Sequence, residues 1–335
     1  MPPLYAGTPE CALRLANLRI GVLHNPRSGA NRAAAAPIRR MFEAHPGIVF
    51  RDASDPASTT HALREMAEHG VNAVAVSGGD GTVNAVLNTV FVDSPFPRPP
   101  LLALLRGGTA NVTARDVGVQ GRQDRALRSL IDRASRGGDG LTVIERPIMR
   151  IDLGAGRDAL YGMFFGAAAI AQGIEYHMRE VHTRGLRGDI GRAVTLTRFV
   201  IAMARGERAI VAPVPITVAI DDEPPSSFDC EMMYVTTLER LVLGLRPYWG
   251  EEAAPLHYAS VRAEPRHWVK ALPGLLRGRP NRYVTPENGY DSRNAQRLLL
   301  GIDSHFFVDG ELFSPTAGMP LALAGGGSAG FIRLQ

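Results

Sequence analysis

A glycine-rich turn between a buried strand and a helix is the feature that most limits how this chain can fold. Residues 77–82, Ser-Gly-Gly-Asp-Gly-Thr, follow the apolar run 74–76 and precede the apolar-rich segment 83–87. A turn of this kind exposes backbone N–H groups at the positive end of the helix dipole, where a phosphate can bind. One carboxylate, that of Asp80, lies among these N–H groups. The segment therefore predicts a phosphate site with its own acid.

The rest of the N-terminal half repeats this alternation of strand and helix. The apolar patterns predict strands at 18–23, 48–50, 73–76 and 101–105, and helices at 31–44, 57–69, 83–90 and 124–136. Such alternation is typical of a doubly wound, parallel α/β sheet. A second Gly-Gly-Asp-Gly, at 137–140, follows a polar helical stretch instead of a strand. We interpret it as a helix exit and flexible linker.

After about residue 140 the pattern changes to short alternating runs separated by Gly, Pro and Asp turns, at 147–153, 159–165, 210–220 and 230–237. These runs are typical of antiparallel strands. A helical insert is expected near 189–205, and a last strand at 319–324 or 330–334. We therefore predict an α/β domain at 1–143 and a β-rich domain at 144–335, whose last strand can return to the first domain.

Composition excludes several classes of protein. The 335 residues are 45% hydrophobic and 21% charged, which suits two cores of moderate size. Cys11 and Cys230 are too few for a disulfide framework or a zinc cluster. No run of about 18 apolar residues occurs, and the N-terminus does not have the pattern of a signal peptide. A cytoplasmic protein that lies at most on a membrane face is expected.

The cationic side chains are of an unusual kind for a phosphate-binding protein. The net charge of +4 favours anionic partners, yet Lys270 is the only lysine. A Walker A loop requires a lysine beside its glycines, so that class of site is excluded. The phosphate site must use backbone N–H groups, arginine and a metal ion.

Three further motifs contain polar residues of the kinds found in binding and catalytic sites. Asn-Pro-Arg-Ser-Gly at 25–29 follows the first strand, Gly-Gly-Thr-Ala-Asn at 107–111 follows the fourth, and Asp-Gly-Glu at 309–311 lies late in the β domain. Each taken alone is more often a turn or a helix cap than a functional site. Their order and spacing favour function.

Together with residues 78–82, these motifs resemble the diacylglycerol kinase catalytic family, which includes sphingosine and ceramide kinases and soluble bacterial lipid kinases. The resemblance is dense over 18–118 and thin from there to 309–311. It implies ATP-dependent phosphorylation of a lipid hydroxyl, with Mg²⁺, in a cleft between an α/β domain and a β-sandwich domain. The residues that would bind the nucleotide by this resemblance are Asn25, Pro26, Arg27, Ser28, Gly29, Ser54, Gly78, Gly79, Asp80, Gly81, Thr82, Asn84, Gly108, Thr109 and Asn111.

The resemblance also implies catalytic roles for three acids. Asp309 and Glu311 would face the acceptor and its Mg²⁺, and Asp80 is the second metal candidate. Attack by a hydroxyl on a γ-phosphoryl group needs a carboxylate near the hydroxyl proton. Asp80, within its N–H groups, is expected to stay ionised and to suit Mg²⁺. The base is left open among Asp309, Glu311 and Asp80.

The sequence departs from the family pattern at several positions. Arg106, Ala85 and Val112 stand where the family usually has Pro, Glu and Asp. Arg106 would add charge at the phosphates, or is simply solvated. The segment 254–258 lacks the Asp-Gly pair of a structural metal site found in many bacterial members, so no such site is predicted.

Two segments, 178–208 and 264–282, are basic and also contain apolar residues, and they are the candidates for contact with a membrane. Each would rest on anionic lipid or, equally, pack its apolar side on its own domain. The predicted partners are a membrane lipid, with ceramide or diacylglycerol favoured, and an anionic membrane surface at the inner face of the membrane. Nucleic acid is not expected, and a homodimer is left open.

Two other functions compete with a lipid kinase. NAD kinases share the Gly-Gly-Asp-Gly loop and would phosphorylate a soluble acceptor. A catalytically weak relative that binds lipid and nucleotide is suggested by Ala85. The Asn-Pro-Arg-Ser-Gly and Asp-Gly-Glu motifs favour the lipid branch.

Overall fold

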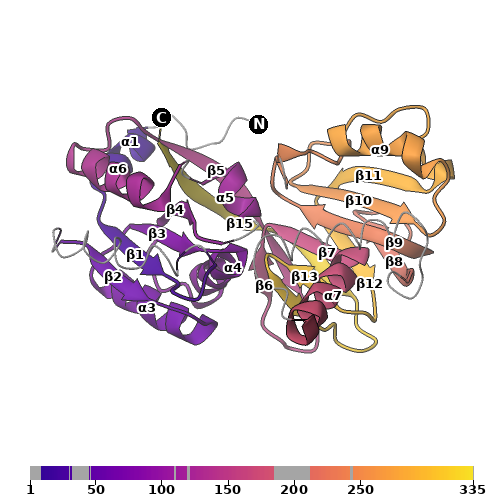
Figure 1. Cartoon of the computed structure of the whole chain (residues 1–335), viewed down its shortest axis with the longest axis horizontal. Helices are drawn as coiled ribbons and strands as arrows, with labels where there is room; N and C mark the ends of the chain where they lie inside the picture. The colour runs from indigo at the N-terminus through magenta and orange to yellow at the C-terminus, as the bar shows by residue number, and fades with distance from the viewer. Residues whose placement is uncertain are drawn as a thin grey trace. The chain divides into compact units, whose positions relative to one another are not determined.

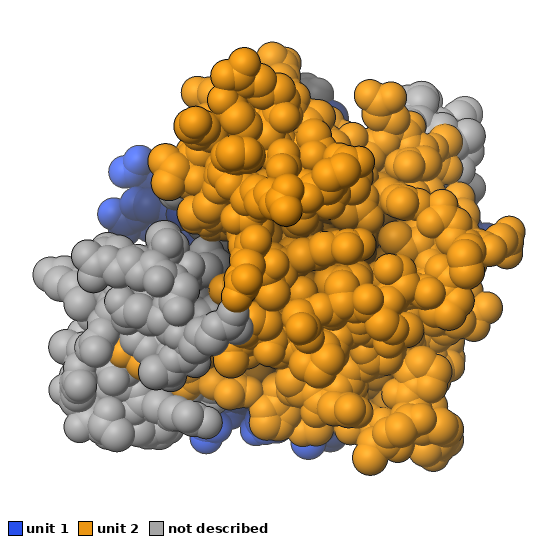
Figure 2. Space-filling model, turned by 90° about the vertical axis from the view of Figure 1, so that its right-hand side faces the viewer, with its two compact units in different colours: residues 1–148, 238–244, 326–335 blue, residues 149–237, 245–325 orange. Residues whose placement is uncertain are grey.

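The fold is taken from a computed structural model, which describes residues 9–29, 31, 45, 47–108, 111–118, 121–184, 212–241 and 244–334. The chain divides into two compact units (Figure 2). Unit 1 comprises residues 1–148, 238–244 and 326–335, and unit 2 comprises 149–237 and 245–325. The predicted boundary at 143 lies a few residues before the observed division. A site shared by the two domains stays a prediction.

Unit 1 is built on a parallel sheet in which the neighbouring strands run β15-β4-β3-β1-β2 (Figure 1). All four predicted strands are present; the sheet buries β1, β3 and nearly all of β4, whereas β2 is only partly buried. Their bounds are β1 Ile20–His24, β2 Val49–Asp52, β3 Ala73–Gly78 and β4 Leu101–Arg106. The parallel register aligns their carboxyl ends at one edge, where loops of open α/β sheets bind ligands.

The described helices of unit 1 are α1 Pro9–Ala16, α3 Pro56–Glu68, α4 Asp80–Asn88, the π-helical turn η1 Thr89–Asp93, α5 Val112–Asp116 and α6 Gln123–Ser135. The predicted helix at 31–44 falls outside the described residues apart from Asn31. Helix α3 begins at a capping box in which Asp55 and Ser58 bond each other's backbone N–H groups. Helix α4 begins at Asp80, earlier than predicted, because Gly79 is its extended N-cap.

The second Gly-Gly-Asp-Gly is a tight turn that joins α6 directly to β5 Leu141–Asp152. Its glycines at 137, 138 and 140 have positive φ, as the interpretation as a helix exit required. It is not a flexible linker, since a Cβ at Gly138 would lie 2.5 Å from the carbonyl oxygen of Leu15.

Unit 2 is built of antiparallel strands around an apolar core that includes Phe165, Tyr258 and Phe306. The strands pair in the order β14-β13-β7-β9-β8-β12-β15, and β9 also pairs with β10, which pairs with β11. Their bounds are β6 Leu160–Gly162, β7 Phe164–Ala168, β8 Val214–Ile220, β9 Ser226–Thr236, β10 Leu256–Arg262, β11 Tyr290–Ala295, β12 Arg297–Gly301, β13 Phe306–Val308, β14 Glu311–Phe313 and β15 Leu321–Leu334.

The two segments that were predicted as alternative last strands, 319–324 and 330–334, both contribute residues to a single strand, β15. Strand β15 pairs antiparallel with β12 through residues 321–324 and parallel with β4 at Phe331. A single strand thus contributes to the sheet of each unit.

Unit 2 also carries α7 Ala169–Arg184, α9 Trp268–Arg277 and the short 3-10 helix η3 Pro286–Asn288. The helical insert expected near 189–205 and most of the basic segment 178–208 lie outside the described residues. Over the described part of the chain, every helix is too short or too polar to cross a bilayer.

Candidate active site

The predicted nucleotide loops of unit 1 meet at the carboxyl edge of its parallel sheet. Asn25 donates its backbone N–H to the carbonyl of Ser77 at 2.9 Å, and Gly107 donates to the carbonyl of Gly78 at 3.0 Å. The N–H of Ala53, after β2, bonds the carbonyl of His24 at 2.9 Å. The loops after β1, β2, β3 and β4 are therefore neighbours, although they are far apart in sequence.

The two glycine pairs of these loops pack backbone against backbone. A Cβ at Gly108 would lie 2.4 Å from the Cα of Gly79, and one at Gly107 would lie 2.7 Å from the backbone nitrogen of Gly78. No side chain fits at such distances, so the approach itself requires glycine. The glycines leave bare backbone at the N-terminal end of α4, where the first amides of a helix lack partners within the helix.

The Asn-Pro-Arg-Ser-Gly loop is bonded to the same glycine turn. The amide of Asn25 donates to the hydroxyl of Thr82 at 2.8 Å, and the N–H of Gly79 donates to the hydroxyl of Ser28 at 3.1 Å. The exposed turn residues Pro26, Arg27 and Gly29 complete this loop, with the N–H of Arg27 bonded to the Asn25 side chain at 2.9 Å.

The carboxylate of Asp80 is held by α5 as well as by its own loop. It accepts the N–H of Thr113 at 3.2 Å. Burial raises the pKa of Asp80 above its ordinary value, while N–H donors from residues 111–113 oppose that rise. The sequence prediction considered only the donors, so the direction of the pKa shift differs from the expectation. Gly81, beside Asp80, lies in the first turn of α4.

Asn111 shapes the loop after β4. Its side-chain oxygen accepts the N–H of Gly108 at 2.8 Å, and its amide donates to the Gly108 carbonyl at 2.7 Å. Asn111 is the N-cap of α5 with φ of 48°, a left-handed conformation that asparagine tolerates better than most residues. It thereby orients the helix end that holds Asp80. Thr109, between them, is outside the described residues.

Two predicted nucleotide residues lie apart from the loop tips. Asn84 is buried in α4, where its side chain accepts the amide of Asn88 at 3.1 Å. Ser54 follows β2, and its hydroxyl donates to Asp55 at 3.3 Å. Their predicted contact with nucleotide stays a prediction.

A buried polar network behind the loops was missed as a unit by the sequence analysis. The hydroxyl of Ser77 donates to Gln123 at 2.7 Å, Gln123 donates to the side chain of Asn31 at 2.8 Å, and Asn31 donates to the carbonyls of Asn25 and Ser77, both at 2.8 Å. His24 approaches Ser77 at 3.1 Å. Gln123 gives no local signal, because its partner Asn31 is distant in sequence.

Arginine supplies positive charge to this edge of the sheet. Arg106 ends β4 opposite Gly78. Burial, together with the nearby charge of Arg115, lowers the pKa of Arg106. Two guanidinium groups held close together repel each other, and an anion beside them would relieve that repulsion. Arg115 was not among the predicted site residues.

A buried ion pair holds α5 in place. Arg146 of β5 lies 3.2 Å from the carboxylate of Asp116, whose side chain is 3% exposed, and 3.2 Å from that of Glu239. Arg333 of β15 bonds the backbone carbonyl of Asp116. Four separate segments of unit 1 are thus joined at the end of the helix that holds Asp80.

In unit 2, Asp309 lies in a tight turn between β13 and β14. Its carboxylate accepts the N–H of Met163 at 2.6 Å and that of Phe164 at 2.9 Å, and its side chain is buried. Its φ of 40° is left-handed, and Gly310 follows with φ of 110°. Both oxygens of Asp309 therefore hold the start of β7.

Glu311 is exposed, whereas Asp309 is buried. Partial burial of the Glu311 carboxyl nevertheless raises its pKa above the ordinary glutamate value. An accessible carboxylate with a raised pKa is suited to general-base chemistry.

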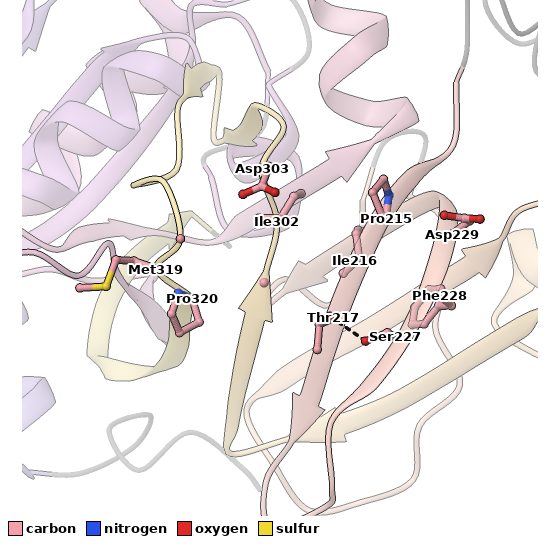
Figure 3. A pocket seen from close by; sticks show the side chains of 12 residues that line it. Pro215, Ile216, Thr217, Ser227, Phe228, Asp229, Ile302, Asp303, Met319 and Pro320 are labelled. Atoms are coloured by element: carbon pink, nitrogen blue, oxygen red, sulfur yellow. Dashed lines mark hydrogen bonds between the residues drawn. The ribbon is translucent and has the colours of Figure 1, made fainter.

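Unit 2 also contains an open groove of about 580 Å³, lined by residues of β8 and β9, of 301–303 and of 318–320. Small and apolar side chains line it, with the carboxylates of Asp229 and Asp303 on its wall. Thr217 and Ser227 are joined across two strands by a 2.8 Å hydrogen bond (Figure 3). The sequence analysis singled out neither acid.

Neither metal clusters nor reactive thiols stand out in the described parts of the chain. No three His, Cys, Asp or Glu side chains come together there in a way that could hold a metal ion. Burial raises the pKa of Cys230 to about 12, so this thiol is unreactive.

The arrangement defines a class of protein: a parallel α/β domain with a phosphate-type loop cluster, combined with an antiparallel β domain. Residues 19–143 match the family model described as the diacylglycerol kinase catalytic domain.

Individual relatives agree with this. A diacylglycerol kinase of Bacillus subtilis is 30% identical over 132 residues, which cover 35% of this chain and 39% of the relative. A diacylglycerol kinase of Mycobacterium tuberculosis is 28% identical over 207 residues, covering 61% and 59%. The matched part thus spans less than two thirds of either relative.

A solved structure of a diacylglycerol kinase from Bacillus anthracis superposes with a TM-score of 0.57 at 15% identity, covering 94% of this chain and 96% of that one. At this identity the likeness supports the fold, including both the α/β and the β-rich part.

Proposed function

We propose that this protein is an ATP-dependent lipid kinase that transfers the γ-phosphoryl group of ATP to a primary hydroxyl of a membrane lipid. The observation that carries the proposal is the backbone contact of the two glycine pairs at the start of α4, with Asp80 beside them, inside a diacylglycerol kinase catalytic domain. The family match covers residues 19–143, and the proposal assigns the activity implied by that match to the whole chain.

The residues at this edge of the sheet fit a nucleotide triphosphate. A Cβ at Gly79 or Gly108 would meet the backbone of the other loop, so the two turns pack closely, and the N-terminal end of α4 beside them suits phosphate oxygens. Arg106 and Arg115 supply the positive charge that lysine would supply in a Walker A loop. The hydrogen bonds of Asn25 and Ser28 to the glycine turn hold the cradle in shape before a ligand arrives.

The same residues suit Mg²⁺ through Asp80. This ion is commonly held in proteins by one or two carboxylates and the substrate phosphates, so one carboxylate is a sufficient protein contribution. When bound there, Mg²⁺ would offset negative charge on the phosphate oxygens. The N–H groups at the start of α5 fix the orientation of the Asp80 carboxylate.

We assign the general base to Glu311. It would accept the proton of the attacking hydroxyl, a role that requires an accessible and ionised carboxylate within reach of the acceptor. Asp309 would act as a positioning residue, because its two oxygens already bond the amides of Met163 and Phe164. On this assignment Asp309 is also a poorer metal ligand than Asp80.

The acceptor is proposed to be diacylglycerol, with ceramide second. The named relatives are diacylglycerol kinases, which favours the glycerolipid. A sphingoid base is a weaker candidate on the same ground, although Asp229 and Asp303 in the groove of unit 2 could pair with its amine.

The test is a labelling assay with radioactive ATP, Mg²⁺ and mixed micelles that contain diacylglycerol, ceramide, sphingosine or phosphatidylglycerol. We expect label in diacylglycerol and less in ceramide, and none in any lipid with Asp80→Asn. NAD is included as a soluble acceptor. Label in NAD alone would replace the proposal by an NAD kinase, and no label in any acceptor, with ATP binding intact, would favour a non-catalytic relative.

A further inference from the structure

Helix α9 packs one face against its own unit. Ala271 and Leu275 are buried against Val261, Val284 and Tyr290. Trp268 turns towards the same cluster and stacks on Tyr290 with ring centroids 6.5 Å apart. Trp268 therefore belongs to the packed side of the helix. Figure 1 shows α9 lying beside β10 and β11.

The opposite face of α9 is an exposed apolar stripe. Val269, Leu272 and Leu276 are 79%, 37% and 39% exposed. Their spacing of three and four residues puts them on one side of a helix. Among the described residues, the other large hydrophobic side chains with such exposure are scattered singly at Leu13, Val92 and Met319. A continuous stripe is a stronger signal than single exposed residues.

Positive charge surrounds this stripe. The segment 264–282 has one acid, Glu264, and five cations, all exposed: Arg266, Lys270, Arg277, Arg279 and Arg282. None of the five forms an ion pair with another residue that the structure describes. Lys270 and Arg282 both contact the ring of Tyr283. The charge is therefore available to an anionic partner.

The helix is held rigidly in this orientation. The side-chain amide of Asn281 donates to the backbone carbonyl of Lys270 at 2.9 Å. The hydroxyl of Tyr290 donates to the backbone carbonyl of Arg266 at 2.9 Å. Gly278 ends α9 with φ of 59°, and a Cβ there would lie 2.0 Å from the carbonyl oxygen of Arg246. The stripe is thus presented by the fold before any partner binds.

We infer that α9 is the membrane-docking helix of this protein and that its partner is an anionic bilayer surface. The stripe would enter the boundary between headgroups and acyl chains, and the cations would meet lipid phosphates. The inference deepens the proposed lipid kinase, which needs to reach a lipid substrate. A protein partner fits less well. Stable interfaces bury about 800 Å² on each side and have few charges at their centre, whereas this stripe consists of three side chains surrounded by cations.

The experiment is vesicle flotation of the full chain without ATP. We expect binding to vesicles of phosphatidylglycerol with phosphatidylcholine, little binding to phosphatidylcholine alone, and weakening by salt. Val269→Ser with Leu276→Ser should lower partitioning about tenfold or more, because each apolar side chain loses its burial in lipid. Arg277→Gln with Arg279→Gln should lower it about fivefold for each cation removed.

Matched controls use exposed residues of the same kind in unit 1. Leu13→Ser with Val92→Ser, and Arg125→Gln with Arg128→Gln on α6, should bind as the unchanged chain does. All variants change exposed side chains, and equal melting temperatures verify their folding.

Turnover of a short-chain, water-soluble diacylglycerol separates this inference from the proposed function. The α9 variants should keep that turnover and lose turnover on vesicles. Vesicle binding without turnover of any lipid would overturn the kinase proposal and leave the docking helix standing. Equal flotation of the α9 variants and the unchanged chain would overturn the docking helix, as would a concentration-dependent dimer that the stripe variants abolish.

Discussion

At the scale of single residues, three acids with similar sequence contexts have different surroundings. Asp80 and Asp309 both accept backbone N–H groups, from α5 and from the start of β7. Glu311 is exposed, and burial of its carboxyl raises its pKa. The proposed assignment of the base to Glu311 rests on its exposure and raised pKa, whereas backbone N–H groups hold Asp80 and Asp309.

Replacing Glu311 tests this assignment. We expect Glu311→Gln to lower kcat by about 10² to 10⁴, the usual contribution of a general base, with an unchanged melting temperature. In the unchanged protein, activity should fall as the pH drops through the pKa of Glu311, since the protonated form cannot accept a proton. This acid limb should lie above the ordinary glutamate pKa, because the shift is upward.

The exposed Glu251→Gln is the matched control for this variant and should leave the rate and its pH profile unchanged. If Glu311→Gln stayed active while Asp309→Asn lost activity without loss of stability, Asp309 would be the base instead.

At the scale of elements, the site depends on how closely two loops approach. The pairs Gly78-Gly79 and Gly107-Gly108 touch through their backbones, and Asn111 shapes the second loop from the N-terminus of α5. Two glycine loops predicted separately from the sequence thus form one surface.

Gly108→Ala tests that contact. The new Cβ would lie 2.4 Å from the Cα of Gly79, so the loops must separate. We expect the free energy of unfolding to fall by about 1–3 kcal/mol, as in other overpacked sites, and ATP affinity to fall with it. Chemical denaturation and calorimetric titration with ATP measure the two effects.

Gly47→Ala serves as the control, because nothing lies within 4 Å of its added Cβ and its φ is not left-handed. Equal ATP affinity for Gly108→Ala and the unchanged protein would mean that the two loops do not form the phosphate cradle.

At the scale of the whole molecule, unit 1 is assembled from segments that are far apart in sequence. Strand β15 adds the C-terminal segment to the sheet beside β4, and residues 238–244 return from within the second half of the chain. The ion pair between Arg146 and Asp116, with Glu239 and Arg333 beside it, joins these segments at α5.

Arg146→Ala tests this assembly. Removing Arg146 leaves the buried carboxylate of Asp116 without its cation, so we expect a loss of about 3–5 kcal/mol in the free energy of unfolding. Arg150→Ala is the control, because its pair with Asp152 is 43% and 39% exposed and should contribute at most about 1 kcal/mol. Similar losses in the two variants, measured by urea denaturation, would argue against the proposed role of the buried pair.

The parallel strands, the glycine turn after β3 and the antiparallel character of the second half follow from local patterns. Apolar runs between turn residues specify these elements, since burial and backbone geometry act over a few neighbouring positions. Helix α1 was missed, and so was the start of α4 at Asp80, because its glycine N-cap has no side-chain signal.

The sequence by itself determined the glycine turns, the order of the polar motifs and the family that this order resembles, because glycine, asparagine and acid positions at strand ends are local features. Tertiary structure decided how they are used. It bonds Gln123 to Asn31 and the start of α5 to Asp80. It also bonds both oxygens of Asp309 to backbone N–H groups and leaves the apolar stripe of α9 exposed. Those outcomes depend on contacts between segments distant along the chain, which no local pattern encodes.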